Sequence, residues 1–198
     1  MQGLALHTLT ICGLDELDVH SARGVTHVLS ILDPGWPEPD AFLAFAPHAR
    51  ATFRFHDAIE PEPDVILPEK RDVEAILAFA REAGDDLGHL LIHCHAGISR
   101  STAAMLMILA QAHAEEDERA VAQRLTRIRP QAWPNARMVG LADECLGRGG
   151  RLLAAAGVIY ARRLEIEPQL AEAMRRMKRE REVELARAAR ARAEERWD

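Results

Sequence analysis

The stretch His93-Cys94-His95-Ala96-Gly97-Ile98-Ser99-Arg100-Ser101 determines what this chain can fold into and what chemistry it can perform. The apolar run before it, residues 88–93, predicts a buried strand, and residues 101–113 carry apolar side chains at helical spacing. We therefore expect a loop that joins the end of a strand to the first turn of a helix. Successive backbone N–H groups in such a loop, together with the helix N-terminus, form an anion-binding nest.

Cys94 and Arg100 give this loop a nucleophile and a fixed cation. Helix N-termini and nearby cations favour the thiolate form of a cysteine, which is the nucleophilic form. Such a thiolate can attack phosphorus and form a phospho-cysteine, which divides hydrolysis into two easier steps. The planar guanidinium of an arginine can bind two phosphoryl oxygens at once. The loop therefore predicts phosphoryl transfer.

The loop resembles the active-site loop of the cysteine-dependent protein tyrosine phosphatases, in which His-Cys is followed by five residues, Arg, and then Ser or Thr. Its Ala-Gly-Ile-Ser interior is most similar to the compact dual-specificity-like branch, and the similarity extends over residues 8–146. The resemblance implies that Cys94 is the nucleophile and that Arg100 binds phosphate. It also implies that Ser101 stabilises the departing thiolate and that His93 orients the cysteine. The residues implied to bind phosphate through backbone amides are His95, Ala96, Gly97, Ile98 and Ser99.

A phosphatase of this kind also needs a carboxylic acid, because the leaving oxygen must be protonated. Residues 51–55 predict a short strand that ends before Asp57, in a loop rich in Pro and acidic residues. The family carries its general acid in a loop after such a strand, and Asp57 fits that order best. Asp64 is the next candidate, and Glu60 and Glu62 share the loop. The alternative is that these four acidic residues are solvated loop carboxylates with no catalytic role.

Two other interpretations of the stretch explain less. His93, Cys94 and His95 could be metal ligands, but neighbours on a strand point to opposite faces. No second Cys or His pair stands at the spacing of a zinc site. A cysteine that only fills the core would leave the glycine and arginine spacing unexplained. The sequence therefore predicts neither a metal nor an organic cofactor.

The composition predicts a soluble cytoplasmic enzyme. The 198 residues carry a net charge of −6, which disfavours a nucleic-acid partner. No apolar stretch approaches the ~20 residues needed to cross a membrane, and the first residues lack the features of a secretion signal. The three cysteines, Cys12, Cys94 and Cys145, are widely spaced, as expected in a reducing compartment.

Strand and helix patterns alternate and predict an α/β fold with a central, mainly parallel sheet flanked by helices. The expected strands cover residues 6–12, 24–32, 51–55 and 88–93. The expected helices before the glycine-rich break cover residues 40–45, 68–83, 101–113, 120–128 and 136–146. Pro68 is expected at the first position of one helix, and Asn135 is expected to cap another.

The chain after the glycine-rich run 147–150 has a different character. A helix is expected over residues 151–163, and a last helix rich in Ala, Arg and Glu is expected to start at Pro168. Its broken apolar stripe predicts a solvated helix that leans on the body, or alternatively an arm that binds a partner or a second copy. The predicted division is a catalytic domain over residues 1–150 and a helical C-terminal extension over residues 151–198.

The predicted function is hydrolysis of a phosphomonoester through a phospho-cysteine. Phosphotyrosine in a protein is the leading substrate, since an aryl phosphate has a good leaving group, and phosphoserine or phosphothreonine are further candidates. A phosphatase of a nucleotide, RNA or phosphoinositide stays open as an alternative. So does a phosphate-binding module with weak turnover.

Overall fold

The computed structural model describes residues 8–84 and 88–194. Four strands form one sheet in the order β1-β4-β2-β3, and every neighbouring pair in it is parallel. The strands are β1 (Thr8–Cys12), β2 (His27–Leu32), β3 (Ala49–Arg54) and β4 (His89–His93). The predicted α/β fold with a parallel sheet is confirmed. The first two residues of the strand expected over 6–12 lie outside the described residues.

The strands β2 and β4 occupy the centre of the sheet. Every residue of β4 is buried, and so is every residue of β2 after His27. Mostly apolar runs of this kind suit parallel strands that are covered on both faces. The edge strands β1 and β3 are partly exposed. The segment that follows β4 therefore leaves from the middle of the sheet.

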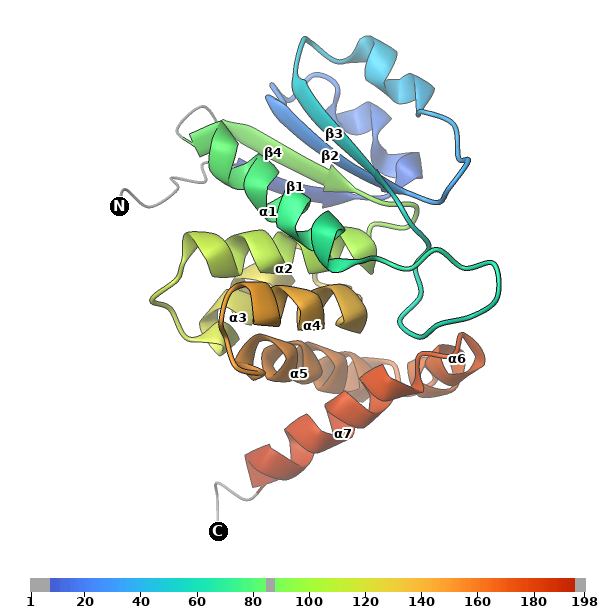
Figure 1. Cartoon of the computed structure of the whole chain (residues 1–198), viewed down its shortest axis with the longest axis vertical. Coiled ribbons are helices and arrows are strands. Elements are labelled where there is room, and N and C mark those ends of the chain that lie inside the picture. Colours follow the sequence, from blue (N-terminus) through green and yellow to red (C-terminus); the bar gives the residue numbers. More distant parts are fainter. Residues whose placement is uncertain (1–7, 85–87, 195–198) are drawn as a thin grey trace.

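Different elements cover the two faces of the sheet (Figure 1). One face is covered by three short 3-10 segments, η1 (Leu14–Glu16), η2 (Asp18–His20) and η3 (Asp40–Ala44). The other face is covered by the helices α1 (Lys70–Ala83) and α2 (Arg100–Ala112). Both faces are thus shielded from water, as a parallel sheet requires.

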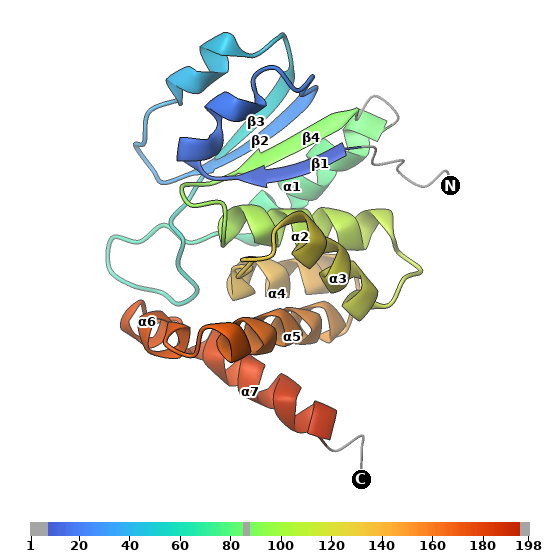
Figure 2. The same cartoon turned by 180° about the vertical axis from the view of Figure 1, so that it is seen from behind.

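Helix α2 is the central helix of the molecule, and all its residues from Arg100 to Ala110 are buried. It lies between the sheet and a second group of helices (Figure 2), which includes α3 (Glu118–Ile128) and α4 (Ala136–Cys145). Asn135 caps α4 as predicted, because its Oδ1 accepts bonds from the N–H groups of Arg137 and Met138, each at 3.1 Å.

Two helix predictions are wrong in detail. Helix α1 begins at Lys70 rather than at Pro68, because Glu69 is the cap and its N–H donates to Oδ2 of Asp72 at 2.8 Å. The segment from Pro168 forms two helices rather than one, α6 (Leu170–Arg176) and α7 (Glu180–Glu194). Lys178 between them has a φ of 57°, a left-handed conformation that turns the chain between the two helices.

The C-terminal helices pack onto the body. Helix α5 (Arg151–Ile166) contacts α3 and α4, and α7 crosses α5 (Figure 1). Gly157 permits this crossing, because a Cβ there would lie 2.9 Å from the carbonyl oxygen of Leu185. Met174 and Val183 are buried in the same apolar cluster as the core of α2. The last helices therefore pack against the body on one side and are exposed on the other.

One apolar core runs through both parts into which the sequence analysis divides the chain. In the apolar stripe of the last helices, Met174 is buried and Leu170 and Leu185 pack against the core, whereas Met177 is exposed. The division at residue 150 and the homo-oligomer stay predictions. None of the described helices is both long and apolar enough to cross a membrane.

Candidate active site

The segment from Cys94 to Arg100, here called the Cys94 loop, joins β4 to α2 as predicted (Figure 1). Cys94 directly follows the last residue of β4, and Arg100 is the first residue of α2. Ligands of parallel α/β folds bind at the carboxyl ends of the strands. The loop therefore occupies the position in this fold where a ligand site is expected.

Five successive carbonyl groups of the Cys94 loop accept hydrogen bonds from groups outside it. The pairs are Leu14 N to His95 O (2.9 Å), Arg129 Nη2 to Ala96 O (3.4 Å), Arg129 Nε to Gly97 O (3.0 Å), Trp133 N to Ile98 O (2.9 Å) and Asn135 N to Ser99 O (3.3 Å). In a trans peptide the C=O and the next N–H point in opposite directions. The N–H groups of residues 96–100 are therefore turned toward the inside of the loop, where they can form an anion-binding nest.

Gly97 is the position of the loop that admits no side chain. Its φ is +67°, and a Cβ there would lie 2.4 Å from the carbonyl carbon of Cys12. The loop thus passes directly over the end of β1. Glycine is required both for the left-handed conformation and for this close approach.

Cys94 lies at the base of the loop with only 2% of its surface exposed. Its Sγ is 3.2 Å from Oγ of Ser101, which is also buried. A hydroxyl at this distance can donate to a sulfur that carries negative charge. The structure thus brings together the cysteine and the serine that the sequence analysis paired.

Arg100, the last residue of the loop, is buried. Its Nη1 donates to Oδ1 of Asp33 at 2.6 Å and to the carbonyl oxygen of Phe55 at 2.7 Å. Its buried Nε has no acceptor among the described residues. A buried donor without a partner is rare in folded proteins, and a phosphoryl oxygen would satisfy it. Asp33 is not identified from the sequence, since nothing in its neighbourhood indicates that it pairs with Arg100, far away in the chain.

His93, the last residue of β4, is buried directly before Cys94. Its Nε2 is 2.7 Å from Oγ of Ser30, which also accepts a bond from Nε of Arg50 at 3.2 Å. Burial and the charge of Arg50 lower the pKa of His93 to about 4. The ring is therefore neutral at neutral pH and held in place, as expected of a residue that orients its neighbour.

Asp57 lies against the Cys94 loop. Its Oδ1 accepts bonds from Oγ of Ser99 at 2.7 Å and from Nδ2 of Asn135 at 2.9 Å, and its Oδ2 is 3.2 Å from Nη1 of Arg179. Burial alone would raise the pKa of Asp57, but the charges of Arg179 and Arg100 and these two hydrogen bonds hold it below the ordinary value.

The rival carboxylates lie elsewhere on the segment between β3 and α1, residues 55–69, here called the Asp57 loop. Asp64 is exposed. Glu62 pairs with Lys178, and Glu60 is 4.0 Å from Arg181. Of the four candidates, Asp57 is the one that contacts Ser99 of the Cys94 loop. This placement favours Asp57 over Asp64 as the acid.

Three further residues support the site and were not assigned to it from the sequence. Arg129 binds two loop carbonyls and also pairs with Glu16 at 2.8 Å. Asn135 is the predicted helix cap, and its Nδ2 also holds Asp57. Arg179 reaches the site from the C-terminal helices. The position of Arg129 before a proline-rich turn is only a weak indication in the sequence that it belongs to the site. Nothing in the sequence around Arg179 indicates that it does.

The arrangement does not suit a metal ion bound by the stretch itself. His93 contacts Ser30, whereas Nε2 of His95 accepts from the N–H of Asp33 at 3.2 Å. Within residues 8–84 and 88–194, no three His, Cys, Asp or Glu side chains are grouped to hold a metal ion.

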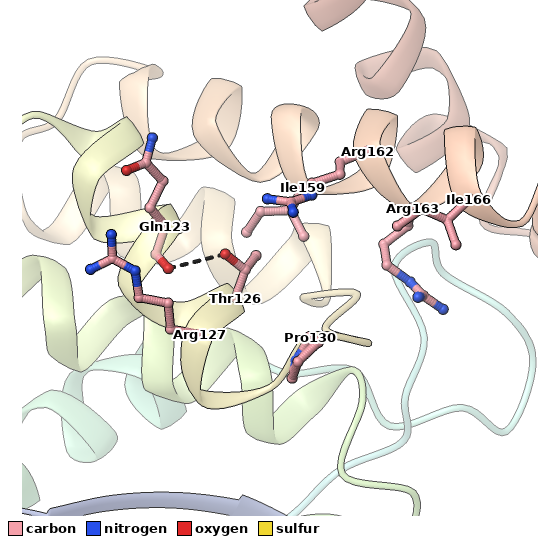
Figure 3. A pocket seen from close by; sticks show the side chains of 8 residues that line it. All are labelled: Gln123, Thr126, Arg127, Pro130, Ile159, Arg162, Arg163 and Ile166. Atoms are coloured by element: carbon pink, nitrogen blue, oxygen red, sulfur yellow. Dashed lines mark hydrogen bonds between the residues drawn. The ribbon is translucent and has the colours of Figure 1, made fainter.

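A separate hollow of about 440 Å³ lies between α3 and α5 (Figure 3). Its lining includes Arg127, Arg162 and Arg163, and Figure 3 shows the side chains of Arg127 and Arg163 extending away from each other. None of its lining residues is a candidate nucleophile or general acid. The reactive groups of the predicted chemistry are therefore gathered at the Cys94 loop and not in this hollow.

No protein-family model matches the sequence, and no curated protein matches it significantly. Solved structures do match. DUSP15 has a TM-score of 0.52 and 21% identity, covering 77% of this chain and 90% of that chain. Human DUSP28 has a TM-score of 0.55 and 18% identity, with coverages of 71% and 92%. PTPMT1 in complex with PI(5)P has a TM-score of 0.50 and 16% identity, with coverages of 72% and 92%.

These similarities show that the chain has the fold of the cysteine-dependent, dual-specificity-like phosphatases. The resemblance on which the sequence analysis relied is confirmed at the level of the fold.

Proposed function

We propose that this protein hydrolyses phosphomonoesters through a phospho-cysteine intermediate on Cys94. The observation that carries the proposal is the orientation of the Cys94 loop, in which the carbonyls of residues 95–99 all accept hydrogen bonds from groups outside the loop. We infer that the N–H groups of the same peptides, which point the opposite way, form the phosphate-binding nest next to Cys94. Donors fixed in this way stabilise charge in a transition state without reorganising.

The proposed reaction has two steps. In the first step, Sγ of Cys94 bonds to phosphorus as the bond from phosphorus to the leaving oxygen breaks, and the carboxylic acid of Asp57 gives that oxygen its proton. In the second step, a water bonds to phosphorus and gives a proton to Asp57 as the S–P bond breaks. Arg100 and the loop N–H groups bind the phosphoryl oxygens, and Ser101 donates to the departing sulfur. The products are an alcohol and phosphate.

We propose phosphotyrosine in proteins as the leading substrate, with phosphoserine and phosphothreonine as further substrates. An aryl phosphate has the better leaving group, so it depends least on an acid whose pKa lies below the ordinary value. The cytoplasm is the proposed location, because a reducing compartment keeps a nucleophilic thiol unoxidised.

A phosphoinositide is the second candidate substrate, because the structure of PTPMT1 that resembles this chain holds PI(5)P. The interior of the Cys94 loop, residues 95–99, offers no lysine to an additional phosphate. This absence favours a substrate with a single phosphate. Nucleotides, RNA and phosphate binding without turnover are the remaining alternatives.

The test compares turnover of an aryl phosphate by the wild type, Cys94→Ser and Cys145→Ser. Cys145 is a half-buried free cysteine and the last residue of α4, whereas the Cys94 loop lies near the start of that helix at Asn135, so the Cys145→Ser variant is the matched control. We expect Cys94→Ser to lose at least about a thousandfold in kcat while still binding phosphate, and Cys145→Ser to resemble the wild type. Full turnover by Cys94→Ser would contradict the proposal.

The substrate class is tested with phosphopeptides, phosphoinositides and nucleotides presented to the same protein. The highest kcat/KM is expected for phosphotyrosine peptides. A preference for phosphoinositides or nucleotides would keep the proposed chemistry and replace the proposed substrate.

A further inference from the structure

The junction between α6 and α7, residues 177–182, brings a buried arginine to the proposed active site. Lys178 adopts a left-handed conformation with a φ of 57°, and the N–H of Arg179 donates to the carbonyl oxygen of Met174 at 2.8 Å. The turn directs Arg179 inward, where 4% of its surface is exposed. A non-glycine residue in this conformation is uncommon and calls for a reason in the surrounding structure.

Arg179 links three partners. Its Nη1 lies 3.2 Å from Oδ2 of Asp57, and its Nη2 donates to Oγ of Ser99 at 2.8 Å. Its Nε and Nη2 donate to the two carboxylate oxygens of Glu182 at 2.8 and 2.7 Å. The guanidinium therefore connects the C-terminal helices, the Asp57 loop and the Cys94 loop in one hydrogen-bonded group.

Glu182 fixes the arginine from behind. It is fully buried, and its carboxylate also accepts bonds from Nε1 of Trp133 and from the N–H of Ala136 at 3.0 Å. Burial raises the pKa of Glu182 and opposes its ionisation, but these four donors favour the carboxylate. Burial also opposes the charge of Arg179, yet Asp57 and Glu182 raise its pKa above the usual value. The hydrogen bonds of this pair therefore fit a carboxylate on Glu182 and a charged guanidinium on Arg179.

Two more cations of the junction face the Asp57 loop. Lys178 pairs with Glu62, and Nη1 of Arg181 is 4.0 Å from Glu60. The Asp57 loop lies beside α6 in both views of the molecule (Figure 1; Figure 2). Exposed pairs such as these contribute little energy each. Together with the Arg179–Asp57 pair, however, they place three cations of the junction against three carboxylates of the Asp57 loop.

We propose that Arg179 is a positioning residue for the hydrolysis proposed above: it ties Asp57, and with it the Asp57 loop, to Ser99 of the Cys94 loop. The inference rests on the proposed function, and it assigns a part of the site to residues beyond 150. Arg179 acts through Asp57 and is not assigned a contact with substrate.

The charge of Arg179 has a direct consequence for the proton that Asp57 transfers. In the first step Asp57 changes from a neutral acid to a carboxylate, and a cation 3.2 Å away stabilises that product. Arg179 therefore makes Asp57 a stronger acid, and it also makes the carboxylic acid of Asp57 lose its proton at lower pH in the free enzyme. The decline of kcat/KM at high pH should start at lower pH than it would without Arg179.

Several titratable or charged groups lie around Asp57. They are Arg100 at the start of α2, His95 in the Cys94 loop, Tyr160 on α5, and Arg179 and Glu182 of the junction. Arg179 is the cation in direct contact with the carboxylate. Opposite charges at such distances lower the pKa of a carboxyl group by about one to three units.

The experiment measures kcat/KM of an aryl phosphate across the acidic and neutral pH range for the full chain. The variants are Arg179→Gln and Arg179→Met, which remove the charge, and Arg179→Lys, which keeps it. Arg176→Met is the matched control, because Arg176 lies on α6 with 77% of its side chain exposed. Asp57→Asn identifies the decline at high pH that belongs to Asp57.

We expect the decline at high pH to move upward by about one unit or more in each charge-removing variant that folds. Arg179→Lys should lie closer to the wild type, and Arg176→Met should equal it. A purely structural role would lower the amount of active protein and leave the position of the decline unchanged. If the decline of kcat/KM at high pH disappears in Asp57→Asn but is unchanged in Arg179→Gln or Arg179→Met, the inference about Arg179 is overturned and the proposed function stands. A wild type without turnover overturns the proposed function.

Discussion

The Cys94 loop and the α6–α7 junction reach the same carboxylate by different structural means. The loop contacts Asp57 through the hydroxyl of Ser99, and its own shape is fixed by bonds to its backbone carbonyls. The junction contacts Asp57 through the side chain of Arg179, which is fixed by the buried carboxylate of Glu182. One region is therefore built on main-chain geometry and the other on a buried group of charges.

The difference predicts which substitutions each region tolerates. The Cys94 loop, which depends on backbone geometry, should lose stability where an added side chain cannot fit, even if no charge changes. The junction, which depends on buried charges, should lose stability when a charge is removed, even if the shape of the side chain is kept. The following substitutions test that distinction.

The largest effect is expected for Gly97→Ala in the Cys94 loop. The new Cβ would meet the carbonyl carbon of Cys12 at 2.4 Å, and φ is +67°. Strain and overlap together should lower the free energy of unfolding by about 4 kcal/mol. Gly140→Ala, on α4 with open space around the new Cβ, should be neutral or stabilise by about 0.5–1 kcal/mol. Equal unfolding curves for the two variants would show that the loop is not built as described.

A smaller effect is expected for Glu182→Gln in the junction. The substitution keeps the shape of the side chain but removes the charge that balances the buried Arg179, which should cost about 3 kcal/mol of unfolding free energy. Glu184→Gln, on the exposed side of the same helix, should change stability by less than about 0.5 kcal/mol. Urea unfolding measures both, and a loss in Glu182→Gln no larger than in Glu184→Gln would contradict the dependence of the junction on buried charges.

The smallest effect concerns His93, which is buried next to the loop. Its pKa of about 4 lies below its ordinary value of 6.5, so the unfolded chain gains a proton before the folded chain does. The stabilisation is present above pH 6.5 and is lost as pH falls toward 4. It should amount to about 2 kcal/mol between neutral pH and pH 5. The free energy of unfolding, measured against pH for the wild type and for His93→Gln, isolates this contribution; equal pH dependence in the two proteins would contradict it.

The parts of the fold that follow from local sequence patterns could be predicted. The apolar runs of β2 and β4 and the cap at Asn135 are properties of short segments. The cap is where expected and β4 differs by one residue, whereas β2 begins at His27 rather than at residue 24. The split between α6 and α7 could not be predicted, because lysine has no preference for the left-handed conformation that Lys178 adopts. Tertiary contacts of Arg179 accompany that turn.

The same distinction applies to the candidate site. Cys94, Arg100 and Ser101 lie within one short stretch, so their spacing could identify them. Arg179 and Asp57 are 122 residues apart, and their pairing depends on how the last helices pack. No local pattern carries that information.

The most direct test of the account is to trap the covalent intermediate. The full chain would be quenched in acid during turnover of an aryl phosphate and analysed by intact-mass spectrometry and peptide mapping. The account predicts one added phosphoryl group, located on Cys94 and absent from Cys94→Ser. Steady turnover without an adduct, or an adduct on another residue, would contradict it.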